Sequence, residues 1–175
     1  MKSRSLIQFI NPHVGGVDIS VGPTKEDKDV TLFIEFAKPL GNSGKTGVNG
    51  QPLVAYGWSS KDKNTKELNT IKLQLSFKEI VRLSTSIDKM QNDYKIEHPT
   101  GNINPKYINV KFSEDKNNIK QLTLTATKII DEGTSKRNIS SGYYFKGEEL
   151  ASLNYILKSF LFNYVNLTVN LHNNE

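Results

Sequence analysis

Residues 30–38, VTLFIEFAK, decide the fold, because their apolar side chains alternate as in a β-strand with one buried face. Leu32, Ile34 and Phe36 fall on one face of this strand, and Phe33 and Glu35 fall on the other. The alternation predicts a sheet with one face covered inside the protein and an opposite face that is polar.

Further strand and helix patterns flank this segment on both sides. We expect strands at 5–10, weakly at 17–21, and at 53–59, 69–77, 93–98, 106–113, 119–129 and 138–145. We expect a short helix over about 77–88, a long helix over about 147–165, a glycine-rich loop at 39–52 and a charged turn at 61–67. The order is four strands and a helix, twice. It predicts an α+β protein with two roughly four-stranded antiparallel sheets, each followed by a helix (ββββα-ββββα).

The alternation also assigns side chains to faces in the other strong strands. The residues expected to point inward are apolar: Ile71, Leu73, Leu75 and Phe77; Ile108, Val110 and Phe112; and Leu122, Leu124 and Ala126. The residues expected to point outward alternate with them: Lys72, Gln74 and Ser76; Tyr107, Asn109 and Lys111; and Gln121, Thr123 and Thr125. We expect residues 1–168 to form a single domain and 169–175 a polar tail, since 175 residues suit one core.

The charge balance is mildly basic, with a net charge of +5 carried by lysine far more than arginine. Only Arg4, Arg82 and Arg137 are arginines. Lysine suits backbone phosphates, whereas arginine is the usual reader of guanine edges, so any nucleic-acid binding should involve little base-edge reading. The many lysines, asparagines and isoleucines are also what an AT-rich genome would produce.

Several classes of protein are disfavoured. The chain has no cysteine, which excludes disulfides and thiolate metal sites, and no apolar run reaches the roughly 18 residues of a membrane span. The first residues contain no apolar signal region, so we expect a cytoplasmic protein, associated with the nucleoid or present in a phage-infected cell. Gly41–Thr46 lacks the first glycine and the helix of a phosphate-binding loop, and His13, His98 and His172 lack ligand spacing. We expect no catalytic residue, no cofactor and no metal site.

The long helix has two apolar patches. Leu150, Leu153, Leu157, Phe160, Leu161 and Tyr164 form one stripe, and Ala151, Tyr155 and Phe162 form a second patch further around the helix. Packing on one sheet needs only the first stripe. The second patch indicates contact between subunits, and the alternative is a broad buried face inside one chain.

The polar faces of the predicted sheets carry aromatic and basic residues. Phe33, Tyr56, Trp58, Tyr107 and Tyr144 lie on or beside strands, and Lys72, Lys111, Lys120 and Lys128 are strand lysines. Rings that stack on bases and ammonium groups that meet phosphates are what binding of single strands requires. Alternatives remain for single residues. Trp58, considered by itself, is more typical of a core residue. Thr123 and Thr125 also suit a strand by their high strand propensity, and the lysines also suit the solvent-exposed edge of a sheet.

The order of these segments resembles the Whirly family. The resemblance lies in VTLFIEFAKPLG at 30–41, in Tyr56-Gly57-Trp58-Ser59, and in Gln74-Leu75-Ser76 running into Glu79-Ile80. It continues in INVKFSEDKNNIKQLTLTATKI at 108–129, and in the last strand and closing helix with Glu149-Leu150-Ala151-x-Leu153 and Phe160. The match covers about residues 5–165. Two segments depart from the family. Lys2-Ser-Arg4-Ser-Leu6 matches the basic motif of the family's first strand only weakly, and the glycine-rich segment at 41–52 is longer than the family's loop.

The resemblance implies a homo-tetramer that binds single-stranded DNA across its sheets with little sequence preference, in DNA replication, recombination or repair. The residues expected to contact DNA are Phe33, Tyr56, Trp58, Lys72, Gln74, Tyr107, Asn109, Lys111, Thr123 and Tyr144. The related PC4 coactivator and the kinetoplastid guide-RNA-binding proteins share this fold, which makes RNA an alternative ligand. A structural module without nucleic-acid binding is a third hypothesis. The lack of a plant transit peptide favours a bacterial, phage or plasmid setting.

Overall fold

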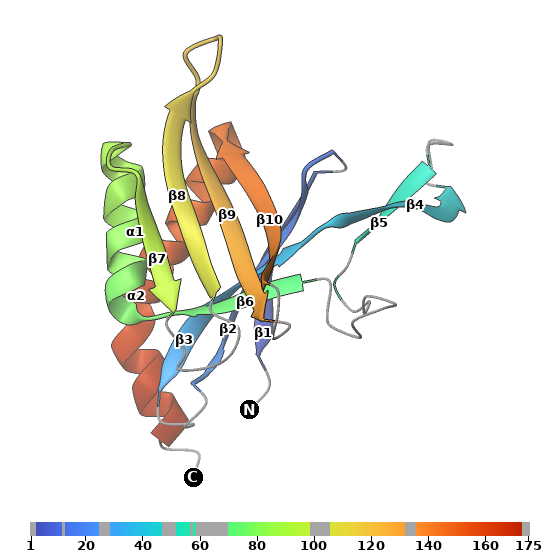
Figure 1. Cartoon of the computed structure of the whole chain (residues 1–175). Helices are drawn as coiled ribbons and strands as arrows, with labels where there is room; N and C mark the ends of the chain where they lie inside the picture. Colours follow the sequence, from blue (N-terminus) through green and yellow to red (C-terminus); the bar gives the residue numbers. More distant parts are fainter. Residues whose placement is uncertain are drawn as a thin grey trace.

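The computed structural model describes residues 3–11, 13–24, 29–46, 52–56, 58, 70–98, 106–131 and 136–172. Side chains are described for these residues except 39–45, 52–56, 98, 131 and 165–172. Two four-stranded antiparallel sheets cross each other, with two helices on one side and a two-stranded ribbon projecting from the other (Figure 1).

The first sheet has the strand order β1-β2-β3-β6. Its strands are β1 (Arg4–Asn11), β2 (Gly15–Pro23), β3 (Val30–Ala37) and β6 (Thr70–Leu75). The segment predicted as a weak strand at 17–21 is therefore nine residues long and lies inside the sheet, paired on both sides. Val17 and Ile19 explain its place, because both are buried on the apolar face.

The second sheet has the order β10-β9-β8-β7. Its strands are β7 (Tyr94–His98), β8 (Lys106–Glu114), β9 (Lys120–Asp131) and β10 (Lys136–Lys146). All three ladders keep a regular register without a bulge, so side chains alternate strictly between the two faces.

Each sheet runs into a helix, as predicted. Helix α1 (Phe77–Lys89) begins at a capping box: the Ser76 hydroxyl accepts from the Glu79 backbone N–H, and the Glu79 carboxylate accepts from the Ser76 N–H at 2.6 Å. Helix α2 (Gly147–His172) closes the chain and continues beyond its predicted end at 165 into residues expected to form the polar tail. Lys158 and Asn154 of α2 both donate to Asp88 of α1, which ties the helices together.

One hydrophobic core joins both sheets and both helices. The apolar residues predicted inward in β3, β6, β8 and β9 are buried in it, except that Phe112 of β8 is only partly buried and packs against it. Ile80, Leu83 and Ile87 of α1 and Leu153, Leu157 and Phe160 of α2 complete this core. Phe77 is a second exception, because it is the first residue of α1 rather than part of β6, and it is 42% exposed beside Tyr164. The first stripe of α2 packs on the core or against it, whereas Tyr155 and Phe162 are 74% and 87% exposed.

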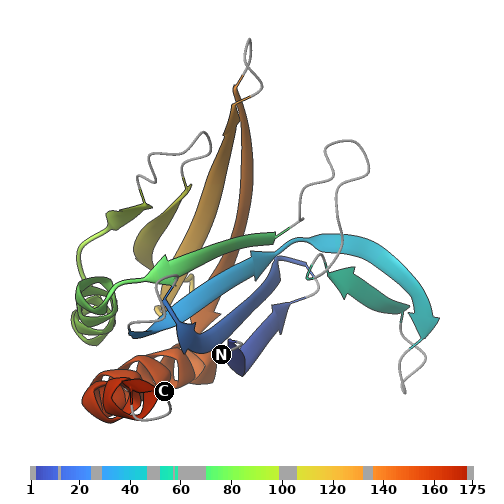
Figure 2. The same cartoon turned by 90° about the horizontal axis from the view of Figure 1, so that it is seen from below.

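Residues 39–46 were predicted as part of a loop, and this prediction was wrong. They form strand β4 (Pro39–Thr46), which pairs with β5 (Pro52–Tyr56) in a separate two-stranded ribbon. Seen from below, β3 and β4 follow one another along a curved path that leaves the body of the protein (Figure 2). The two strands pair Pro39 with Tyr56, Asn42 with Val54 and Thr46 with Pro52. Ladder bonds join backbone groups, so this pairing does not require the apolar alternation of a buried strand. The charged turn predicted at 61–67 lies outside the described residues.

Gly15 allows the sheets to approach where they cross. Gly15 has φ +149°, and a Cβ there would lie 2.8 Å from the Ala37 carbonyl oxygen and 3.3 Å from that of Gly142. The ends of β2 and β3 therefore meet the middle of β10 backbone to backbone. No helix in the described part of the chain is long and apolar enough to span a membrane.

Candidate nucleic-acid interface

Five of the predicted contact residues share the polar face of the second sheet. Lys111, Thr123 and Tyr144 lie directly across from one another on β8, β9 and β10. Asn109 lies in the next row and Tyr107 in the row after it, on the same face. Lys111 and Asn109 are exposed, and the others are half-buried. The strict alternation of these strands thus produces one continuous surface of rings, hydroxyls and ammonium groups.

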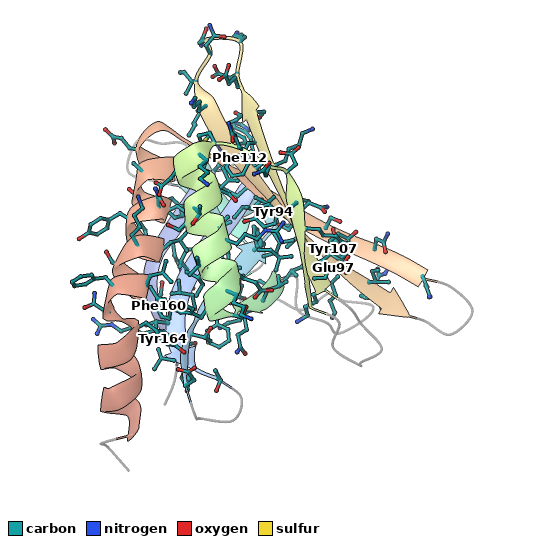
Figure 3. All side chains as sticks on the ribbon, turned by 90° about the vertical axis from the view of Figure 1, so that its left-hand side faces the viewer. Tyr94, Glu97, Tyr107, Phe112, Phe160 and Tyr164 are labelled. Carbon is teal, nitrogen blue, oxygen red and sulfur yellow. The ribbon has the colours of Figure 1, made fainter. Side chains whose placement is uncertain are left out.

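Each tyrosine on this face has a lysine beside its ring. The Lys95 ammonium lies 3.9 Å from the centroid of the Tyr107 ring, and the Lys146 ammonium lies 5.9 Å from that of Tyr144. Lys95 also pairs with Glu97 at 2.7 Å. Figure 3 shows Tyr107 and Glu97 on the side of β7 and β8 that faces away from α1, whereas Tyr94 lies on the α1 side. Binding of a single-stranded nucleotide uses a ring for its base and a cation for its phosphate.

The polar face of the first sheet has the same pairing. Phe33 and Gln74 lie directly opposite each other on β3 and β6, and the Lys72 ammonium lies 4.9 Å from the centroid of the Phe33 ring. Lys72 also lies 3.9 Å from the Glu35 carboxylate. Ring and lysine therefore occur together on both sheets, although each sheet is built from a different part of the chain.

The first sheet differs in having a polar hollow of about 240 Å³ on this face. Ser5, Asp18, Ser20, Glu35, Trp58 and Lys72 are among the residues that line it. Trp58 contacts β2 so closely that a Cβ on Gly16 would come 2.7 Å from the indole. The structure thus places Trp58 beside the polar face and outside the core cluster. The backbone of Tyr56 lies in β5, and its side chain is outside the described part of the structure.

The end of β1 contacts strand β10 at the edge of the second sheet. The Asn11 side-chain amide, at the end of β1, donates to the Tyr144 hydroxyl at 3.2 Å.

Two of the strand lysines do not belong to these faces. Lys120 and Lys128 of β9 project on the same side as Leu122, Leu124 and Ala126, because side chains two residues apart share a face. The prediction that they belong to the outward set was wrong. Lys95 and Lys146 take their place on the polar face. Lys95 alternates with the inward Ile96, which was a usable signal. Lys146 shares a face with Tyr144 but lies one residue beyond the strand predicted at 138–145, and the prediction missed it for that reason.

A further hollow lies on α1 and is distinct from both polar faces. It is lined by Arg82, Thr85, Ser86, Lys89 and Asn92, and the Arg82 guanidinium lies 3.9 Å from the centroid of the Tyr94 ring. Burial raises the pKa of the Tyr94 hydroxyl, and the neighbouring Ser86 and Arg82 oppose this effect. The site serves to pack α1 on β7.

No protein-family model and no curated protein sequence matches the chain. Solved structures do match its fold. The plant transcriptional regulator PBF-2 aligns with a TM-score of 0.59 and 11% identity, over 100% of this chain and 89% of its own. WHY3 from Arabidopsis thaliana aligns with a TM-score of 0.58 and 14% identity, over 98% of this chain and 93% of its own. WHY1 from the same plant aligns with a TM-score of 0.55 and 16% identity, over 94% of this chain and 85% of its own. These are Whirly proteins, and the chain has a Whirly-like fold of two four-stranded antiparallel sheets, each followed by a helix.

Proposed function

We propose that the protein binds single-stranded DNA across the polar faces of its two sheets, with little sequence preference, by stacking of bases and contacts between lysines and phosphates. The observation that carries the proposal is the pairing of ring and lysine at Tyr107, Tyr144 and Phe33. A core or a purely solubilising surface has no need of this pairing. Every base has a flat face, so stacking on rings tolerates sequence.

The polar chemistry of the second sheet fits a phosphate backbone. Lys95, Lys111 and Lys146 lie on the face that also carries the hydroxyls of Thr123 and Thr125 and the amide of Asn109. Ammonium groups attract phosphates, and hydroxyls and amides donate hydrogen bonds to them without reading a base. The affinity should therefore fall steeply with salt, because each lysine–phosphate contact releases counterions.

We further propose that the protein works as a homo-tetramer. Ala151, Tyr155 and Phe162 of α2 are exposed in the single chain, as contact between subunits requires and as burial within one chain does not. Exposed aromatic residues that form one patch on a helix mark an association surface. A tetramer would bring several pairs of polar faces together and lengthen the path for a single strand.

The biological setting proposed is DNA replication, recombination or repair, in the cytoplasm, at the nucleoid or in a phage-infected cell. The structural neighbour PBF-2 is a transcriptional regulator, which makes control of transcription a second candidate. RNA remains the alternative ligand on the same faces. A groove without partners for the 2′-hydroxyl should not favour RNA over DNA.

The test is a titration of fluorescent oligo-dT, its RNA counterpart oligo-U, and a duplex of equal length, each at several salt concentrations. The proposal predicts binding of oligo-dT that weakens steeply with salt, weaker binding of duplex, and no preference for RNA. Absence of oligo-dT binding at low salt would leave the structural module as the better hypothesis. Equal affinity for duplex would contradict stacking as the mechanism.

A further inference from the structure

The hollow on the polar face of the first sheet has a charge pattern that phosphate binding does not explain. Asp18, Glu35 and Lys72 lie side by side in one row across β2, β3 and β6. Two carboxylates therefore face a single ammonium group. Like charges directly opposite on neighbouring strands destabilise a sheet, and they would repel a phosphate. A ligand with N–H donors would complement this row.

The carboxylates are held in place and partly withdrawn from water. Asp18 is 8% exposed and accepts a hydrogen bond from the Ser5 hydroxyl at 2.5 Å, which leaves its second oxygen for a ligand. The Glu35 side chain is 18% exposed. The Ser20 hydroxyl in the same hollow is buried and lacks a hydrogen-bond partner within the described structure. Positioned acceptors beside an unpaired hydroxyl indicate a binding site rather than a solvated surface.

We infer that this hollow holds a guanine base and gives the protein a preference for guanine at one position of the bound strand. This inference rests on the proposed function. The pairing edge of guanine presents one acceptor, O6, followed by two donors, N1–H and the N2 amino group. Lys72 supplies the matching donor, and Glu35 supplies two adjacent acceptors. In this pose the second hydrogen of the amino group would face Asp18, the neighbour of Glu35 in the row.

Aromatic groups border the same hollow. Trp58 forms part of its lining, and Phe33 lies in the next row, directly opposite Ser20. A base in the hollow would have a ring to lie against. The volume of about 240 Å³ suits one base rather than a larger ligand.

The other bases match this row less well. Thymine presents a single N–H between two carbonyl oxygens, and those oxygens would face carboxylates. Adenine and cytosine each present one amino group where guanine presents two donors. A bidentate contact of this kind discriminates by about tenfold at a partly exposed site, and thymine should bind worst.

The experiment uses oligo-dT in which one central residue is replaced by dG, dA, dC or deoxyinosine. The wild-type protein should bind the dG oligomer about tenfold tighter than all-dT. Deoxyinosine, which lacks the N2 amino group, should lose most of that gain. Glu35→Gln and Asp18→Asn should each reduce the dG preference to less than about twofold, while binding to all-dT stays equal or becomes tighter. Glu114→Gln, which removes an exposed carboxylate at the far end of β8, should keep the preference.

The outcomes separate the two proposals. Binding of all-dT with no gain from dG overturns the guanine site and leaves the proposed function standing. A dG preference that survives Glu35→Gln in a variant with wild-type thermal stability also overturns the site. Failure to bind any oligomer overturns both.

Discussion

Tyr107→Ala tests stacking at a position where the ring does little else. Tyr107 lies outside the core cluster, is half-buried and contacts Lys95 through its ring. Removal of a stacking ring costs about 1–3 kcal/mol for each base, so the affinity for oligo-dT should fall by about fivefold to more than a hundredfold. The free energy of unfolding should fall by only about 0.5–1 kcal/mol, the value of an exposed ring–cation contact.

The assay is fluorescence anisotropy with oligo-dT, paired with thermal unfolding of each variant. Tyr107→Phe is the matched control, since it keeps the ring and should keep most of the affinity. Tyr144→Ala should weaken binding too, but with a larger loss of stability, because Tyr144 accepts a hydrogen bond from Asn11 and stacks on Tyr143. Wild-type affinity in Tyr107→Ala would refute stacking on this face. Unfolding of the variant would refute the assignment of the face.

Three further predictions address phosphate contacts, assembly and pH. Lys111→Ala should lower the slope of log affinity against log salt by about 0.7, the value for one phosphate contact on a single strand, and an unchanged slope would remove Lys111 from the interface. Phe162→Glu should reduce the mass measured by light scattering below that of the tetramer, whereas Phe162→Leu should not. Hydrogen bonds from Lys158 and Asn154 hold the pKa of Asp88 below its ordinary value of 3.8. These two hydrogen bonds therefore stabilise the fold fully above the ordinary pKa of Asp88. Their contribution is lost as the pH falls through the lowered pKa of the folded state. Asp88→Asn should cost about 0.5 kcal/mol at neutral pH and flatten this part of the acid unfolding curve.

The apolar alternation of single strands predicted most of the fold. Phe33 and Glu35, or Tyr107 and Asn109, are assigned to a face by their neighbours two residues away, and the ladders bear this out. The capping box of Ser76 and Glu79 likewise lies within four residues of sequence. Such local signals are strong because the same backbone geometry repeats at every residue.

The ribbon of β4 and β5 could not be predicted from the alternation of apolar side chains. Gly41, Asn42 and Gly44 have the composition of a loop, yet they lie in a strand held by backbone pairing. No side-chain pattern accompanies a ladder that buries little apolar surface. Lys120 and Lys128 are a different case, because the alternation through Leu122, Leu124 and Ala126 already places them on the core side, where their long stems carry the charge outward at the strand ends.

The row of Asp18, Glu35 and Lys72 depends on pairing between distant strands. Its members are 17 and 37 residues apart, and only the register of β2, β3 and β6 brings them together. The sequence suggested little base reading because arginine is scarce, but carboxylates accept from bases as readily as arginine donates to them. The candidate guanine site therefore could not be predicted from the sequence without the strand register of the first sheet.

Photo-cross-linking of 5-bromouracil-substituted oligo-dT, followed by mass spectrometry of the linked peptides, tests most directly whether single strands lie on the polar faces. Aromatic residues near a base capture the activated ring, so cross-links should fall on Tyr107, Tyr144 and Phe33, and should diminish at high salt together with binding. Cross-links confined to the helices, at Tyr155 or Phe162 of α2 or around Tyr94 under α1, would contradict the account.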